Sequence, residues 1–324
     1  MATENTTIPA EAAEAPSDAK KTLDVQKAKE MAKSPKGKMA GIGIVALIVL
    51  IAVGIAAFLF LRTDSQDDYS YKLTVDDATI TGLVNQDLET LRIPKTIDDL
   101  PVTKIGDNAF AYNKIITSVK LPGSVTFIGN TAFSGCTSLE TISLPGSVTE
   151  IGSGAFGDCG NLKDVSIPGS VTKIGAFAFS NCSSLSKIKL PDGVTSIEPK
   201  TFLGCKNLKS VSMSGKVSSI GTAAFAGCES LKSISLTNYI DTIPSNTFEN
   251  CKSLTKVEIP KSVKKIGSYA FNGCTKLSRL EIPETVTEIG GHAFDGCPDL
   301  TIYGKKGSKA DQFARANQIK FKAK

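Results

Sequence analysis

The residues best suited to chemistry in this sequence are eight cysteines and a single histidine. A zinc or iron–sulfur site needs ligands that cluster in one locality, often as Cys-x-x-Cys, and one histidine excludes a multi-histidine centre. The cysteines instead recur every 23 residues, as Cys136, Cys159, Cys182, Cys205, Cys228, Cys251, Cys274 and Cys297. We therefore predict no metal, no cofactor and a column of free, buried, structural thiols. Disulfides between neighbouring repeats are the alternative.

Catalytic constellations are missing from the rest of the sequence. No Ser-His-Asp set, phosphate-binding loop or carboxylate pair is identifiable. His292 stands in a variable column of the repeat and is expected at the surface. The pairs Asp67-Asp68 and Asp76-Asp77 indicate a spacer and a turn rather than a calcium site. The net charge of +5 comes without a basic block interleaved with aromatics. We therefore expect neither an enzyme nor a nucleic-acid partner.

A 23-residue repeat must position these side chains. In the unit 161–183, Val165 and Ile167 alternate about Ser166 as in a half-buried strand, and Pro168 ends that strand. One unit cannot close a core, so the units must stack into a parallel β solenoid. A second column contains phenylalanine at Phe110, Phe133, Phe156, Phe179, Phe202, Phe225, Phe248, Phe271 and Phe294.

The residue before each cysteine is always Gly, Asn or Asp, from Gly135 and Asp158 through to Gly296. These residue types tolerate positive φ, so we predict a left-handed turn there in every unit. Tyr112 and Asn113 interrupt the two columns in the first unit, which we expect to be irregular.

The ends of the repeat differ from its middle, as solenoid ends must. Residues 69–104 are predicted to form an N-terminal cap with a hairpin, Tyr69–Val75 and Ala78–Val84, and a first imperfect repeat. Regular repeats follow over 105–303, ending with a strand at Thr301–Tyr303. Residues 304–324 are predicted to be a C-terminal cap. There Ser308 begins a short helix that presents Ala310, Phe313 and Ala314 on one face, Asn317 ends it, and a final edge segment follows.

The N-terminal part has a different composition. Residues 1–38 lack aromatics and are predicted to be a disordered tail. Met39–Leu61 carries no charge and would span roughly 34 Å as a helix, enough to cross a bilayer. Lysines precede this run and aspartates soon follow it, which places the tail in the cytoplasm and everything after Leu61 outside. We predict an uncleaved signal anchor with a spacer at 62–68; a cleaved signal peptide is the alternative.

The repeat resembles the BspA-like leucine-rich repeat family, also called the Treponema pallidum type. The residues that carry the resemblance run Leu139-x-x-Ile142-x-Leu144-Pro145-x-x-Val148-x-x-Ile151-Gly152-x-x-Ala155-Phe156-x-x-Cys159, and the likeness covers about residues 88–303. It implies a leucine-rich repeat solenoid, mostly β with short 3-10 or helical turns, preceded here by one transmembrane helix. The family consists mostly of surface or secreted proteins associated with adhesion to host proteins or other cells.

In such a fold, the residues that flank the central apolar position of each strand face the concave surface. On that face and the position before it, eight basic groups oppose four acidic ones, with many hydroxyls. The predicted ligand-binding residues are Lys163, Lys187, Lys189, Lys209, Lys232, Lys256 and Arg279. The alternative is a solvated sheet face whose charges provide solubility. We expect no aromatic on this face, and hence weak, multivalent contacts with acidic glycans or protein patches.

Four aromatics, Phe127, Phe177, Tyr239 and Tyr269, occupy columns that are elsewhere polar or small, and are expected to be exposed. Taken together, the sequence predicts a single-pass protein of the cell membrane whose extracellular repeats mediate binding or adhesion to proteins or glycans. The alternative is a structural envelope protein without a soluble ligand.

Overall fold

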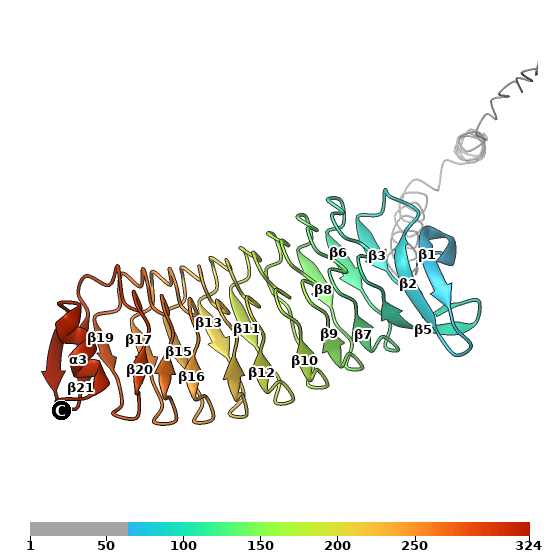
Figure 1. The fold of residues 1–324 in the computed structure, drawn as a ribbon. Helices are drawn as coiled ribbons and strands as arrows, with labels where there is room; N and C mark the ends of the chain where they lie inside the picture. The colour runs from blue at the N-terminus through green and yellow to red at the C-terminus, as the bar shows by residue number, and fades with distance from the viewer. Residues whose placement is uncertain (1–63) are drawn as a thin grey trace, which may run out of the picture. The chain divides into compact units, whose positions relative to one another are not determined.

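The computed structural model describes residues 64–324, which form one solenoid of stacked turns (Figure 1). The predicted tail at 1–38, the predicted anchor at 39–61 and the first two residues of the predicted spacer lie outside the described residues. Between Asp64 and Lys324, no helix has both the length and the apolar character needed to cross a bilayer.

One ladder of parallel strands follows the period of the repeat. Thr141 pairs with Ser118, and Ser210 pairs with Lys187, each 23 residues earlier. The turn at Asp164 joins this ladder only through a single bridge to Thr141. The strands are β3 (Thr90–Arg92), β6 (Ser118–Lys120), β8 (Thr141–Ser143), β11 (Lys187–Lys189), β13 (Ser210–Ser212), β15 (Ser233–Ser235), β17 (Lys256–Glu258), β19 (Arg279–Glu281) and β21 (Thr301–Gly304).

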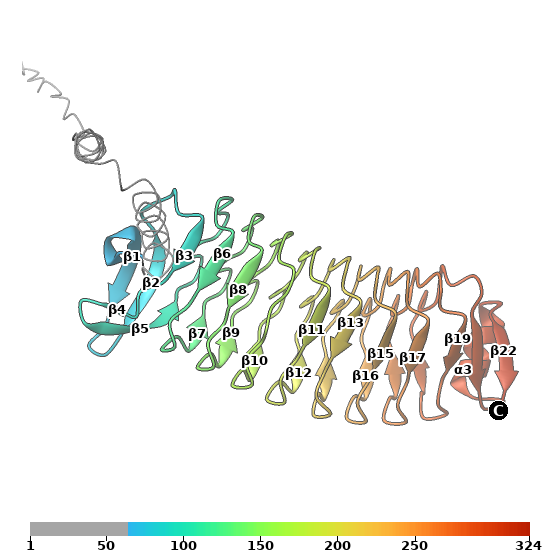
Figure 2. The same cartoon turned by 180° about the vertical axis from the view of Figure 1, so that it is seen from behind.

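A second ladder of shorter strands forms where each turn reaches its conserved-type isoleucine column, for example Ile151 against Ile174. Figure 2 shows both ladders from behind. These strands are β5 (Leu100–Ile105), β7 (Phe127–Ile128), β9 (Glu150–Ile151), β10 (Lys173–Ile174), β12 (Ser196–Ile197), β14 (Ser219–Ile220), β16 (Thr242–Ile243), β18 (Lys265–Ile266) and β20 (Glu288–Ile289).

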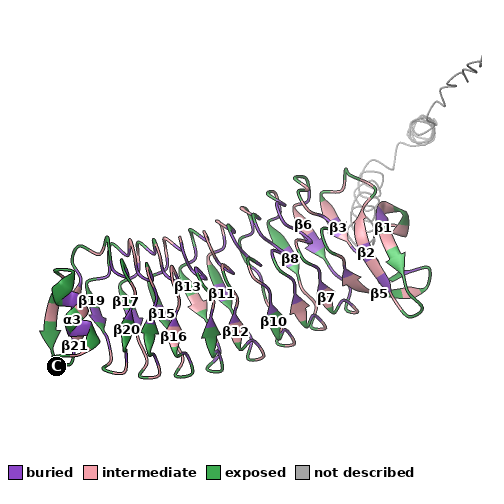
Figure 3. Ribbon diagram, in the orientation of Figure 1, coloured by how far each residue is buried: buried purple, intermediate pink, exposed green. Residues whose placement is uncertain are grey.

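The phenylalanine column is the centre of the core. From Phe110 to Phe294 the rings stack face to face with centroids 5.1–5.8 Å apart. The rings from Phe133 to Phe271 are fully buried, and buried residues extend along the whole solenoid (Figure 3). Each ring therefore packs on the turn before and the turn after it, which is how one repeat supplies the hydrophobic contacts its neighbour lacks.

Two left-handed columns shape each turn. The predicted one is confirmed: Gly135, Asp158 and their equivalents up to Gly296 have φ between 56° and 72°. Tyr112 has φ of 62°, so the expectation of an irregular first unit is wrong at this position. The sequence did not predict a second column four residues earlier, because its residue types vary widely. It contains Asn108, Thr131, Gly154, Phe177, Lys200, Ala223, Asn246, Tyr269 and His292.

The N-terminal cap contains the predicted hairpin, formed by β1 (Tyr69–Leu73) and β2 (Ala78–Leu83). A further strand, β4 (Thr96–Ile97), pairs antiparallel with β5. Residues 64–68 of the predicted spacer belong to this cap, because η1 (Gln66–Asp68) is closed by a capping box on Ser65. The carboxylate of Asp64 also accepts a hydrogen bond from the backbone of Arg92 at 2.7 Å.

The C-terminal cap closes the other end of the core. Ser308 accepts a hydrogen bond from the Asp311 amide and begins α3 (Lys309–Ala316), and Asn317 is its C-cap, as predicted. Phe313 packs edge-on against Phe294 at 5.8 Å. The chain then returns as β22 (Lys320–Ala323), which pairs parallel with β21 and extends the first ladder by one strand. The cap therefore covers the last ring and lengthens the sheet.

Candidate functional site

The outward side chains of the first ladder form one continuous surface, which we call the strand face. In β8, β11, β15, β17 and β19 the middle residue is buried and its two neighbours are exposed. This alternation is what a strand with one solvated side requires. The seven predicted binding residues, Lys163, Lys187, Lys189, Lys209, Lys232, Lys256 and Arg279, are all exposed on this face or at its edge.

The structure separates these cations into two groups. Three of them neutralise acids on the same face: Lys163 lies 2.7 Å from Glu140, Lys187 lies 3.2 Å from Asp164, and Lys256 lies 2.8 Å from Glu258. These pairs are at least half exposed on both sides, so each contributes little to stability. Their effect is to remove net charge from the turns that carry them.

Lys189, Lys209 and Lys232 make no ion pair within residues 64–324. We call these three residues the central patch; they belong to β11 and to the segments that lead into β13 and β15. Lys209 and Lys232 occupy equivalent positions of adjacent turns, about 4.8 Å apart along the solenoid. Like charges at such positions repel each other, and a bound anion would relieve that repulsion.

Hydroxyl groups surround the central patch. A shallow groove here is lined by Ser166, Lys189, Ser210 and Ser212, among others. Ser233 and Ser235 continue the hydroxyl rows on β15. The middle of the strand face therefore offers cations and neutral hydrogen-bonding groups, and none of the acids that balance the charge elsewhere on the face.

One expectation for this surface is wrong: the strand face does carry an aromatic residue. Tyr303 stands on β21 in register with Glu281 of β19. The Arg279 guanidinium lies 3.8 Å from the centroid of its ring, and the Lys322 ammonium lies 5.8 Å from it. Continuing the strand alternation from Arg279 and Glu281 into the predicted strand Thr301–Tyr303 would have found it.

The C-terminal cap is strongly basic, which the sequence analysis also missed. Residues 304–324 contain one acid, Asp311, which is buried and bonded to Arg315 at 2.7 Å. This pairing holds the pKa of the Asp311 carboxyl below its usual range. The cap has seven basic residues: Lys305, Lys306, Lys309, Arg315, Lys320, Lys322 and Lys324.

The cysteine column does not have the character of a catalytic site. Each thiol from Cys136 to Cys297 donates a hydrogen bond of 3.0–3.2 Å to a phenylalanine carbonyl of an earlier turn. Burial raises the pKa of Cys205 and of Cys251 to about 12, which keeps both thiols protonated at neutral pH. In the part of the chain that the structure describes, no cluster of three or more His, Cys, Asp or Glu side chains could hold a metal ion.

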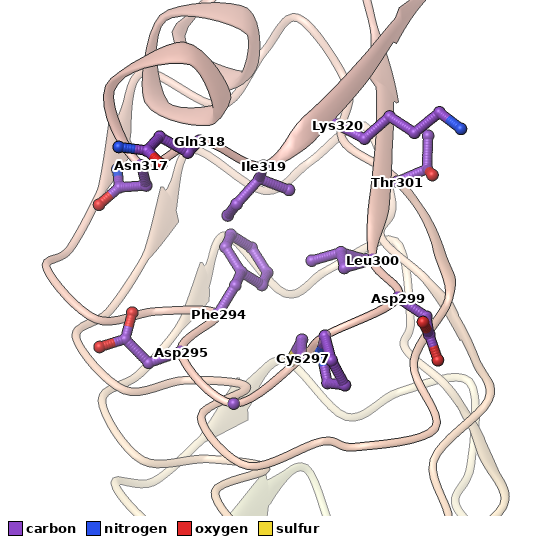
Figure 4. Close-up of a pocket in the computed structure, with 12 residues that line it drawn as sticks. Phe294, Asp295, Cys297, Asp299, Leu300, Thr301, Asn317, Gln318, Ile319 and Lys320 are labelled. Atoms are coloured by element: carbon purple, nitrogen blue, oxygen red, sulfur yellow. The ribbon is translucent and has the colours of Figure 1, made fainter.

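A pocket lies at the seam between the last turn and the C-terminal cap (Figure 4). Phe294 and Leu300 point into it beneath Ile319, while Asp295 and Asp299 lie nearer its rim. Cys297 lines this pocket and is the only partly exposed member of the thiol column. A hydrogen bond from the Cys274 thiol lowers the pKa of Cys297. This pocket is separate from the central patch.

The other predicted surface aromatics lie away from the strand face and from each other. Phe177 is 41% exposed beneath the ammonium of Lys200, and Tyr239 is 68% exposed. Tyr269 stacks on His292 at 5.0 Å, and His292 is bonded to Asp295 at 2.7 Å. Phe127 is half-buried. The fold does not gather these side chains into one site.

Comparison with known families and structures supports the reading of the repeat. The family profile described as the BspA type leucine rich repeat region matches in six copies, over residues 103–214 and 195–306. No curated protein matches the chain.

Solved structures give the same result. A leucine-rich repeat protein from Bacteroides ovatus is 30% identical, with a TM-score of 0.67 over 81% of this chain and 67% of its own. The T. pallidum leucine rich repeat protein is also 30% identical, with a TM-score of 0.51 over 67% of this chain and 91% of its own. A leucine rich cell surface protein from Faecalibacterium prausnitzii is 26% identical, with a TM-score of 0.51 over 81% and 94%.

Proposed function

Since the chain belongs to the BspA-type leucine-rich repeat family, we propose that its solenoid is a cell-surface binding module whose strand face holds an acidic macromolecule. A solenoid presents a long row of side chains on a rigid sheet, which suits extended contacts rather than a closed catalytic pocket. A relative of known structure is described as a cell surface protein. The fold alone does not specify a ligand, so the proposal depends on the residues of the face.

One observation carries the proposal: the positive charge of the central patch has no counter-charge. Acids at Glu140, Asp164 and Glu258 are each occupied by a lysine of the face. Lys189, Lys209 and Lys232 remain available within residues 64–324. Exposed cations of this kind give modest energy individually, so binding is expected to be the sum of several weak contacts and to weaken with salt.

The proposed location is the outer side of a cell membrane, with Met39–Leu61 as the anchor and the N-terminus in the cytoplasm. The uncharged run and the lysines before it support this orientation. Protease treatment of intact cells should remove the repeat domain and leave an epitope tag at the N-terminus intact. Protection of the repeats would contradict the orientation.

Binding itself is tested with the full chain in a nonionic detergent, on an array of acidic and neutral glycans and matrix proteins. We expect acidic ligands to bind, and binding to fall about tenfold or more when Lys189, Lys209 and Lys232 are all changed to Glu. The matched control changes Lys114, Lys216 and Lys264 to Glu, which are exposed and lie outside the central patch. It should retain binding.

An equal loss in both variants would attribute binding to net charge and overturn the assignment to the central patch. If no acidic ligand binds at all, the binding proposal fails and the role as a structural envelope protein replaces it.

A further inference from the structure

The strand face does not end at the last repeat. Arg279 of β19 pairs in register with Thr301 of β21, which pairs with Lys320 of β22. Two positions further along, Glu281, Tyr303 and Lys322 form the next row. Residues paired across neighbouring strands project to the same side of a sheet. Lys320 and Lys322 therefore lie on the same face as the central patch.

The opposite side of the same strands is apolar, which settles their orientation. Leu280 and Ile302 are fully buried, and Phe321 is half-buried against the core. Lys320 and Lys322, by contrast, are exposed. The alternation of β22 therefore continues the alternation of the repeats, although its sequence does not match the repeat.

Arg279, Lys320 and Lys322 form a second group of cations, which we call the terminal cluster. Tyr303 orients Arg279 by stacking on its guanidinium at 3.8 Å, and Lys322 lies near the same ring. The nearby acid, Glu281, is paired with Lys324. No residue of the terminal cluster has an ion pair within the described part of the chain. A stacked guanidinium keeps its N–H edge available for a carboxylate or sulfate.

A neutral turn separates the two groups. β17 lies between β15 and β19, and its two charges, Lys256 and Glu258, cancel in a pair at 2.8 Å. From β11 to β22 the strand positions are six steps apart, which corresponds to about 29 Å at about 4.8 Å per step. The cations thus lie in two clusters along one line.

We propose that the strand face binds a linear anionic glycan that occupies the central patch and the terminal cluster at the same time. This inference rests on the proposed function and names its ligand class. Two separated clusters on a straight row match a chain with repeated acidic groups better than a single small anion. The hydroxyls of Ser210, Ser212, Ser233 and Ser235 suit the hydroxyl and sulfate groups of a sugar chain.

The stacking of Tyr303 argues against single-stranded nucleic acid as the ligand. Proteins that bind single strands use free aromatic rings on which bases stack. Here Arg279 covers the ring of the one aromatic residue on the β11–β22 part of the face. The energetic consequence of the two clusters is avidity. Once a chain is long enough to reach both, the second contact becomes intramolecular, and affinity rises by a factor on the order of 10²–10⁴.

The test measures the affinity of the full chain, in nonionic detergent, for heparin oligosaccharides of graded length. We expect weak binding of oligosaccharides much shorter than about 29 Å and a steep rise, at least about tenfold, for those that exceed it. Changing Arg279 to Ala with Lys320 and Lys322 to Glu should lower the affinity for long chains to that for short ones. The affinity for short chains, which the central patch binds alone, should stay the same.

A matched control changes Lys306 and Lys309 to Glu. Both are exposed residues of the same cap but stand outside the strand rows, so the length dependence should persist. Unchanged melting temperatures would show that the variants are folded. Affinity that does not depend on length, while the central-patch variant still loses binding, would overturn this inference and leave the proposed function standing. Equal affinity for single-stranded DNA of the same length would overturn the glycan class.

Discussion

The Sγ atom of Cys205 donates a hydrogen bond to the backbone carbonyl of Phe179, 3.1 Å away in an earlier turn. The same relationship recurs for every cysteine of the column. The 23-residue spacing of the thiols is therefore a structural bond between turns, made beside the stacked rings. This role has a direct consequence for their reactivity.

In the folded protein we expect alkylating reagents to modify Cys297 and to leave the other seven cysteines untouched. Cys297 is partly exposed, whereas the others are buried and burial raises their pKa. Mass spectrometry after brief treatment at neutral pH gives the number of adducts. Treatment of the unfolded, unreduced protein should give eight adducts, and fewer would reveal disulfides in place of free thiols.

Phe202→Ala should lower the free energy of unfolding by about 3–5 kcal/mol. The ring of Phe202 is fully buried between those of Phe179 and Phe225, at 5.8 and 5.6 Å. Phe177→Ala is the control, because that ring is 41% exposed and its loss should cost well under about 1 kcal/mol. Urea denaturation followed by circular dichroism compares the two, and similar costs would show that the stacked column is not the core.

Gly175→Ala should destabilise the solenoid by about 1–3 kcal/mol. A β-carbon at Gly175 would lie 2.5 Å from the backbone nitrogen of Ser153, so adjacent turns would have to separate. Gly169→Ala in the same unit would meet no atom within 4 Å and should be tolerated. Thermal unfolding distinguishes the two variants. Equal melting temperatures would mean that the turns can move apart at no cost.

The N-terminal cap should lose stability in acid because of Asp77. Its carboxylate accepts hydrogen bonds from Thr103, Thr74 and Lys104, which lower its pKa to about 2. A carboxyl with a depressed pKa stabilises the fold above its ordinary pKa near about 4, and this stability is lost as pH falls through about 2. Hydrogen exchange of β1 and β2 should accelerate over this range. Asp77→Asn should remove that pH dependence, and if it persisted, Asp77 would not be its origin.

Much of the fold follows from the sequence because a repeat states each local preference many times. The spacing of Phe202 and its equivalents predicts the buried column, and Gly, Asn and Asp before each cysteine predict the left-handed turn. The second left-handed column could not be found in this way. Its members range from Gly154 to Phe177 and Tyr269, and the close stacking of turns imposes their conformation against local preference.

The candidate site divides along the same line. The sequence by itself determined the solenoid, its core and a basic row of side chains, since all three depend on spacing within one 23-residue period. Only the tertiary structure decided which cations remain unpaired and where the face ends. Glu281 meets Lys324 across 43 residues, and β22 reaches β21 only after α3 has turned the chain back. Contacts made outside the period, such as that of Arg279 with Tyr303, depend on how the cap packs against the last turn.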